Sequence, residues 1–104
     1  MIHKLRPKFF YYWYNAYEIL QNLGIHDDIS IDEDIMLKII EYLLKKHKVK
    51  YRNVKVLKDE YNLVFLIYDC NNDLTGFAVF DGYTLNIIVF LTSGNKKYIT
   101  VAFT

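Results

Sequence analysis

The chain has 104 residues, the size of one domain, and 53% of them are hydrophobic while 24% are charged. Its formal net charge is +1, so no global attraction to nucleic acid or to a membrane is expected, and such binding must rest on local clusters. The single cysteine, Cys70, excludes an internal disulfide and a cysteine metal cage, and it fits a reducing compartment. These features predict one globular domain over residues 1–104, located inside the cell.

The basic start of the chain, followed by apolar residues, has the outline of a signal peptide. The apolar run is aromatic rather than aliphatic, includes Asn15 and Glu18, and lacks a small-residue cleavage pattern. The longest uncharged segment late in the chain, Gly82 to Asn95, is far shorter than a membrane span of about 20 apolar residues. We therefore expect a soluble protein that is not secreted and has no membrane partner.

The first predicted element is a helix over residues 8–23, bracketed by Pro7 at its start and Gly24 at its end. An apolar stripe along this helix consists of Phe9, Trp13, Ala16, Leu20 and Leu23. Tyr11, Tyr12 and Tyr14 fall outside the stripe, so the helix has a second aromatic face. Such a face is typical of an interface, and the alternative is that the tyrosine hydroxyls reach water.

The second predicted helix covers residues 30–48. Ser30 and Glu33 have the spacing of a capping box, which places the helix start near Ile31. Its core face consists of Ile35, Met36, Ile39, Ile40, Leu43 and Leu44. Acids at the amino end and lysines at the carboxyl end oppose the helix dipole. The short acidic connection at residues 25–29 predicts that the two helices form a hairpin.

From Val49 onward the hydrophobic period changes from 3.6 to 2 residues. Strands are predicted at residues 51–58, 63–68, 75–80, 85–92 and 98–103. The first is polar and interrupted near Asn53, as at a sheet edge, whereas residues 63–68 are continuously apolar. That run fits a strand that is covered on both faces or packed closely by the helices. The predicted fold is α+β: an N-terminal helical hairpin packed on a four- to five-stranded antiparallel β-meander.

The densest charge cluster is basic, since seven of the 13 Lys and Arg residues lie between Lys45 and Lys58 with no acid among them. We call this set the basic stripe: Lys45, Lys46, Lys48, Lys50, Arg52, Lys55 and Lys58, with Tyr51 and His47 interleaved. Cations beside an aromatic ring suit phosphate contact combined with base stacking. The alternative is that these lysines complement a helix dipole and protect a sheet edge.

Metal and cofactor sites are not expected. The acids Asp27, Asp28, Asp32, Glu33 and Asp34 match no calcium-loop spacing and are interpreted as solvated residues at a helix start. His3, His26 and His47 are scattered, and Cys70 is interpreted as a small buried hydrophobic residue. No serine lies in a nucleophile elbow and no glycine-rich loop precedes a helix, so the chain is not expected to be an enzyme.

Two helices before an antiparallel meander, with basic residues and tyrosines nearby, form a pattern similar to the bacterial mRNA-interferase toxins. That resemblance implies a small ribonuclease and nominates Lys50, Arg52, Tyr51 and His47. Separately, the composition is rich in Ile, Tyr and Lys, poor in cysteine and free of motifs, and it resembles small orphan proteins of hyperthermophilic archaeal viruses. This second resemblance implies an accessory or virion-associated protein and supplies no site.

The predicted function is that of a small, non-enzymatic interaction or accessory protein that forms a homodimer. The predicted interface is the aromatic first helix with Tyr11, Tyr12 and Tyr14, the terminal strand at residues 97–103, or both. That strand has one lysine at its start and is otherwise a poorly protected edge. The alternative is a nucleic-acid-binding protein that uses the basic stripe, and the second alternative is an mRNA-interferase-like ribonuclease.

Overall fold

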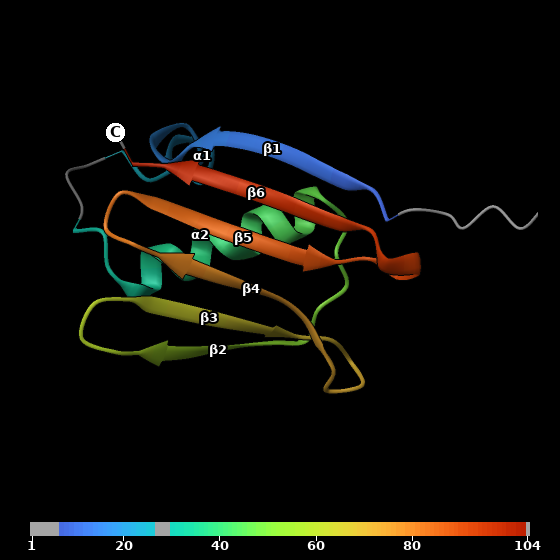
Figure 1. Cartoon of the computed structure of the whole chain (residues 1–104). Helices are drawn as coiled ribbons and strands as arrows, with labels where there is room; N and C mark the ends of the chain where they lie inside the picture. The colour runs from blue at the N-terminus through green and yellow to red at the C-terminus, as the bar shows by residue number, and fades with distance from the viewer. Residues whose placement is uncertain (1–6, 27–29, 104) are drawn as a thin grey trace, which may run out of the picture.

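The computed structural model describes residues 7–26 and 30–103. In it, six strands form one mixed sheet and two helices lie on one face of that sheet (Figure 1). The elements in chain order are β1 (Phe9–Asn15), α1 (Ala16–Asn22), α2 (Glu33–Lys46), β2 (Asn53–Lys58), β3 (Leu63–Tyr68), β4 (Leu74–Phe80), β5 (Thr84–Phe90), a short 3-10 helix (Thr92–Gly94) and β6 (Lys96–Ala102).

The strand order in the sheet is β1-β6-β5-β4-β3-β2. Successive strands from β2 to β6 pair antiparallel, whereas β1 pairs parallel with β6. The α+β class is therefore confirmed, and β2 to β6 form the predicted meander. The prediction of four to five strands was incomplete, because a sixth strand at the start of the chain makes the sheet mixed.

The predicted helix over residues 8–23 is wrong in its first half, where β1 is a strand. The run of aromatic residues has a high preference for strands, and its even and odd positions face opposite sides of the sheet. Phe9 and Trp13 are four residues apart, a spacing that places two residues on one face in a strand as well as in a helix. The aromatic stripe therefore did not distinguish the two structures.

Asn15 ends the strand and begins the helix. Its side-chain oxygen accepts hydrogen bonds from the backbone N–H groups of Tyr17 at 2.9 Å and Glu18 at 3.3 Å, so it caps α1. The helix is only seven residues long and buries Ala16, Ile19 and Leu20. The N-terminal helical hairpin is thus partly wrong, since a strand comes first and α1 is short. The predicted connection at residues 25–29 lies partly outside the described residues.

Helix α2 agrees with the prediction in its core face, because all six of the aliphatic residues listed above for that face are buried. Its cap differs. Asp32, not Ser30, accepts a hydrogen bond from the Ile35 backbone N–H, at 3.0 Å. Glu33 instead forms an ion pair with Lys58 at 3.2 Å, so the predicted capping box does not form. An acid in the first turn stabilises the helix through the dipole in either arrangement.

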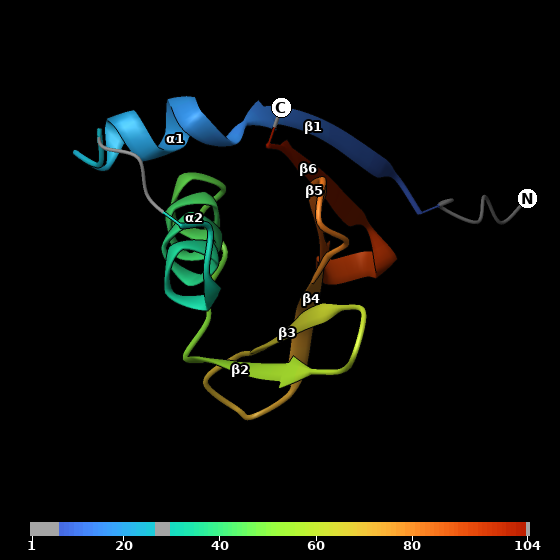
Figure 2. The same cartoon turned by 90° about the vertical axis from the view of Figure 1, so that its left-hand side faces the viewer.

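The hydrophobic core lies between α2 and one face of the sheet. On that face the buried sheet residues are Phe65, Ile67, Ala78, Leu85, Ile87, Val89, Ile99 and Val101. Seen edge-on, the sheet has α1 and α2 on one side only, and neither described helix lies on the other side (Figure 2). The two faces of the sheet therefore have different environments in this chain.

Candidate interaction face and basic pocket

The second face of the sheet, which neither described helix covers, is rich in large apolar side chains. We call it the open face; from the strand registers it includes Phe9, Tyr11, Trp13, Asn53, Lys55, Leu57, Val64, Leu66, Tyr68, Phe77, Val79, Thr84, Asn86, Ile88, Phe90, Lys96, Tyr98 and Thr100. Only two of these residues are charged, and both are lysines. Seven of them are aromatic, so the face has the composition of a buried surface.

Strand β1 presents the most exposed part of this face. The exposed fraction is 76% for Tyr11 and 70% for Trp13. Tyr11 stacks on Tyr98 of the neighbouring strand with ring centroids 5.2 Å apart, and Phe9 lies 5.9 Å from the same ring. These rings form an aromatic surface, which is the type of surface enriched in interface centres.

The central strands are apolar on both sides. An antiparallel sheet with one solvated face normally alternates apolar and polar residues along each strand. In β3, however, Val64 and Leu66 on the open face are as apolar as Phe65 and Ile67 on the helix face. The sequence therefore has the pattern of strands that are covered on both faces, whereas the described helices cover only one face.

The three tyrosines predicted to form an interface do not lie on one surface. Tyr11 is on the open face, but Tyr12 and Tyr14 point to the helix side and pack against the core. The Tyr14 hydroxyl is 2.8 Å from Nε2 of His47, and the Tyr12 ring centroid is 4.4 Å from the His47 ring. The alternation of a strand explains this split, which a helical surface would not have produced.

The predicted edge at residues 97–103 is also wrong. Strand β6 has β1 on one side and β5 on the other, so both of its edges are paired. The two outer strands are β1 and β2. Strand β2 carries Lys55 and Lys58, but β1 contains no charged residue, which leaves it without the usual protection of an edge.

The basic stripe does not form one surface. Lys55 lies on the open face with its Nζ 5.4 Å from the Tyr68 ring centroid, and Lys58 pairs with Glu33 at the opposite end of the sheet. Tyr51 packs against the core, and burial first, then the charge of Glu41, raises the pKa of its hydroxyl. Its ring is thus unsuited to the base stacking that the stripe predicted.

The other cations of the basic stripe lie near cations from distant parts of the chain. The Lys96 backbone N–H donates to the Lys8 carbonyl at 2.9 Å, and the Lys97 Nζ donates to the His47 carbonyl at 3.4 Å. We call this end of the molecule the basic end, and it consists of Lys8, Lys45, Lys46, Lys48, Lys50, Arg52, Lys96 and Lys97. Sequence reasoning missed Lys8, Lys96 and Lys97 because only the sheet brings them near α2.

His47 lies where α2 ends, between these cations and β1. Burial lowers the pKa of its imidazole, and the neighbouring Lys97 and Lys46 lower it further. The Lys46 Nζ also lies 5.1 Å from the Tyr14 ring centroid. The imidazole is therefore favoured in its neutral form, hydrogen-bonded to a tyrosine and surrounded by positive charge.

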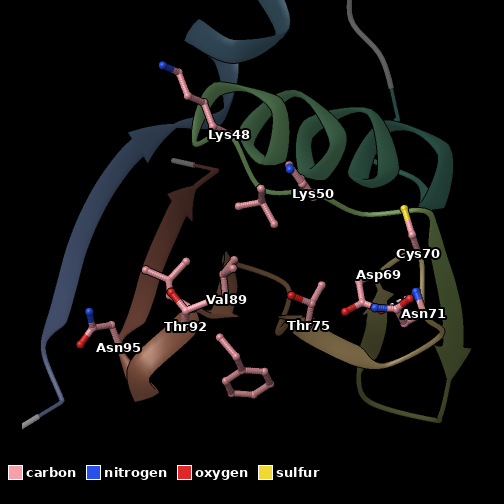
Figure 3. Close-up of a pocket in the computed structure, with 12 residues that line it drawn as sticks. Lys48, Lys50, Asp69, Cys70, Asn71, Thr75, Val89, Thr92 and Asn95 are labelled. Carbon is pink, nitrogen blue, oxygen red and sulfur yellow. Dashed lines mark hydrogen bonds between the residues drawn. The ribbon is translucent and has the colours of Figure 1, made fainter.

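A pocket of about 500 Å³ opens at the basic end, on the helix side of the sheet (Figure 3). Its lining comes from the turn after α2, the β3–β4 turn, the ends of β4 and β5 and the β5–β6 connection: Lys48, Val49, Lys50, Asp69, Cys70, Asn71, Thr75, Val89, Phe90, Leu91, Thr92 and Asn95. Cys70 is exposed there, which corrects its interpretation as a buried residue.

Of the residues nominated by the ribonuclease resemblance, only Lys50 lines this pocket. No group of three or more His, Cys, Asp or Glu residues capable of holding a metal ion occurs among residues 7–26 and 30–103. Asp27 and Asp28 of the acidic cluster, and His3, lie outside the described residues. Neither α1 nor α2 has the length and apolarity required to cross a membrane.

No protein-family model, curated protein or solved structure matches this chain.

Proposed function

We propose that this chain is a small, non-enzymatic interaction protein that forms a homodimer through the open face of its sheet. The observation that carries the proposal is that β3 is apolar on both faces and that β4 and β5 add Phe77, Val79, Ile88 and Phe90 to the open face, while α1 and α2 lie on the other face only. Monomeric proteins rarely expose a contiguous apolar patch larger than a few hundred Å². A second sheet packed on the first is the usual way of covering such a surface.

The dimensions of the open face suit a stable dimer. Six strands spaced about 4.8 Å apart, each with up to seven residues rising about 3.3 Å, give a footprint of about 650 Å². Two copies together bury about 1,300 Å² in this arrangement. Stable interfaces bury about 1,200–2,000 Å² in total, so the face is large enough to hold two copies together.

A second copy is the occupant favoured by the charge pattern. Lys55 lies on the outer strand β2 and Lys96 at the start of β6, so the two cations are at the rim. The centre holds Ile88 and Val79 beside the uncharged Asn86, whose Oδ1 accepts from the Thr100 hydroxyl at 3.2 Å on the same face. A centre without charged residues and a charged rim is the usual anatomy of an interface. A twofold axis through the centre would pair apolar surface with apolar surface and leave the cations at the periphery.

Light scattering coupled to size-exclusion chromatography tests the proposal on matched tyrosine variants. Tyr11→Lys places a charge on the open face, whereas Tyr61→Lys places it in the β2–β3 turn, and the wild-type exposed fractions are 76% and 85%. We expect a wild-type dimer at tens of micromolar, a dissociation constant raised at least about tenfold by Tyr11→Lys, and no change in Tyr61→Lys. Ile88→Lys, at the centre of the face, should give a folded monomer.

Two results contradict the proposal. The first is a wild-type protein that stays monomeric at tens of micromolar. The second is a dimer that neither Tyr11→Lys nor Ile88→Lys weakens, which would direct attention to the uncharged edge of β1. Circular dichroism of each variant shows whether loss of the dimer reflects loss of the fold.

A further inference from the structure

We propose that the pocket at the basic end binds a nucleoside phosphate, with Lys48 and Lys50 contacting the phosphate group. The pocket lies on the helix side of the sheet, so this inference is independent of the homodimer on the open face. Its volume of about 500 Å³ is within the range of about 300–1,000 Å³ that is usual for small-molecule sites.

The two cations of the pocket, Lys48 and Lys50, outnumber its one acid, Asp69. Of the described Lys and Arg residues, only Lys58 forms an ion pair with a carboxylate, and it lies outside the pocket. The one acid in the lining, Asp69, uses Oδ1 to accept the backbone N–H groups of Asn71 at 2.8 Å and Asp73 at 3.0 Å. Lys50 and Lys48 therefore keep donors available for an anion from solution.

The end of α2 does not oppose an anion as strongly as a bare helix terminus does. The last carbonyl oxygens of the helix are occupied, since Leu44 accepts from Val49 N–H at 2.8 Å and Lys45 accepts from Lys48 N–H at 3.0 Å. The His47 carbonyl accepts from the Lys97 Nζ at 3.4 Å. Lysines in the last turn satisfy the helix dipole, so Lys48 and Lys50, which lie beyond it, are not needed for that purpose.

Lys48 is also in an unfavourable backbone conformation. Its φ is +56°, at the position after a helix where glycine is the preferred residue. The side chain starts at the rim of the pocket and extends away from Lys50 in Figure 3, so its ammonium group turns toward the pocket when it contacts a ligand. A lysine in place of glycine costs stability at this position, and a charge required at the rim of a binding site explains why that cost is present.

The remaining lining supplies groups for a sugar and a base. Thr75 and Thr92 lie across the pocket from Lys50, and their hydroxyls are able to donate to a phosphate or accept from a sugar hydroxyl (Figure 3). Val49 and Leu91 give the lining apolar surface, which suits the face of a base, whereas the Phe90 ring packs beside Phe77 on the open face. Cations, hydroxyls and apolar surface together favour a nucleoside phosphate over inorganic phosphate.

A free mononucleotide and a nucleotide within a single strand both offer a phosphate, a sugar and a base. Titrations of the full chain, followed by amide chemical shifts in NMR spectra, distinguish these two ligands. The probes are inorganic phosphate, adenosine monophosphate and a short oligothymidylate. We expect shifts at residues 48–50, 69–75 and 91–95 with both nucleotide probes. If the oligothymidylate binds far more tightly, with a steep dependence on salt, the natural ligand is a strand; similar affinities identify a free nucleotide.

Two lysine variants and one control give the decisive comparison. Lys50→Gln should weaken both nucleotide probes by about tenfold or more, whereas Lys58→Gln, in the same basic stripe but paired with Glu33, should not. Lys48→Gly should weaken binding and at the same time raise the Tm by about 2–6 °C, because it relieves the backbone strain. A purely structural role for Lys48 would not produce these opposite effects.

The inference is overturned if neither nucleotide probe shifts the pocket amides at millimolar concentrations, or if binding persists unchanged in Lys50→Gln. Shifts confined to the open face overturn it as well. The monomeric variant Ile88→Lys should bind both probes like the wild type, so a failure of the pocket and a failure of the homodimer are distinguishable.

Discussion

Gly76 in β4 is the most crowded glycine of the sheet, and Gly76→Ala is a direct test of how β4 and β5 pair. A Cβ added at this position would lie 2.6 Å from the Ile88 carbonyl oxygen and 3.5 Å from Cδ1 of Ile67. The first distance is impossible without movement, and because the obstructing atom belongs to the backbone, β5 itself must shift. Overpacking of this kind costs about 1–3 kcal/mol, and the lower entropy of the unfolded alanine chain offsets about 0.5–1 kcal/mol of it.

We therefore expect Gly76→Ala to lower the free energy of unfolding by about 1–2 kcal/mol, measured by urea denaturation at one fixed protein concentration. Gly24 is the matched control, since its φ is +79° and no atom lies within 4 Å of an added Cβ. At Gly24, substitution by Asn should lower the free energy of unfolding less than substitution by Ala, because Asn tolerates that backbone conformation. At Gly76, Asn should cost more than Ala. A Gly76→Ala variant as stable as the wild type would refute the register of β4 against β5.

Three further predictions concern α2 and its surroundings. Asp32→Ala should lower the free energy of unfolding by about 1 kcal/mol in urea denaturation, because Asp32 caps the first turn, whereas Ser30→Ala should have little effect. The folded-state pKa of His47 is below its ordinary 6.5 because of burial and, to a smaller extent, the charges of Lys97 and Lys46. The unfolded chain therefore binds the proton more tightly than the folded chain. The free energy of unfolding should therefore fall as the pH decreases below about 6.5. It should depend less on pH in a His47→Gln variant, and an unchanged pH dependence in that variant would contradict the prediction. Lys58→Met should change stability by less than about 0.5 kcal/mol, because the ion pair is exposed.

The part of the fold that the sequence predicts best is the part where periodicity and turns agree. The core face of α2 has an unambiguous helical spacing from Ile35 to Leu44, and β3 is bounded by turn residues on both sides, so its predicted ends match the structure. The Asp81 carboxylate accepts the Tyr83 and Thr84 backbone N–H groups, as expected of a turn residue. Local signals of this kind need no information from the rest of the chain.

Strand β1 was mispredicted because its local signals conflict. Pro7 and Gly24 are typical of the two ends of a helix, and the aromatic residues at positions 9 and 13 fit both periods. What decides the outcome is a partner at the far end of the chain, since β1 completes its backbone hydrogen bonds by pairing with β6. Asn15, a favoured cap residue, was the one local sign that the helix starts later.

The candidate sites were predictable only in part, for the same reason. Residues Lys45 to Arg52 are adjacent in sequence and were identified as a basic cluster. The contributions of Lys8 and Lys96 depend on the pairing of β1 with β6, and those of Thr75 and Thr92 depend on the turns of the meander. Conversely, Lys55 and Lys58 belong to the cluster in sequence but are separated from it by the direction of β2.

The described helices cover only half of the apolar side chains of β3. Six consecutive apolar residues predict a strand that is covered on both faces, and the helices account for Phe65 and Ile67 but not for Val64 and Leu66. A second copy on the open face resolves this difference without any further element in the chain. Because the helices and the basic pocket lie on the opposite face of the sheet, such a dimer leaves both pockets accessible. The two proposed functions are therefore compatible, and ligand binding is not expected to change the dissociation constant of the dimer.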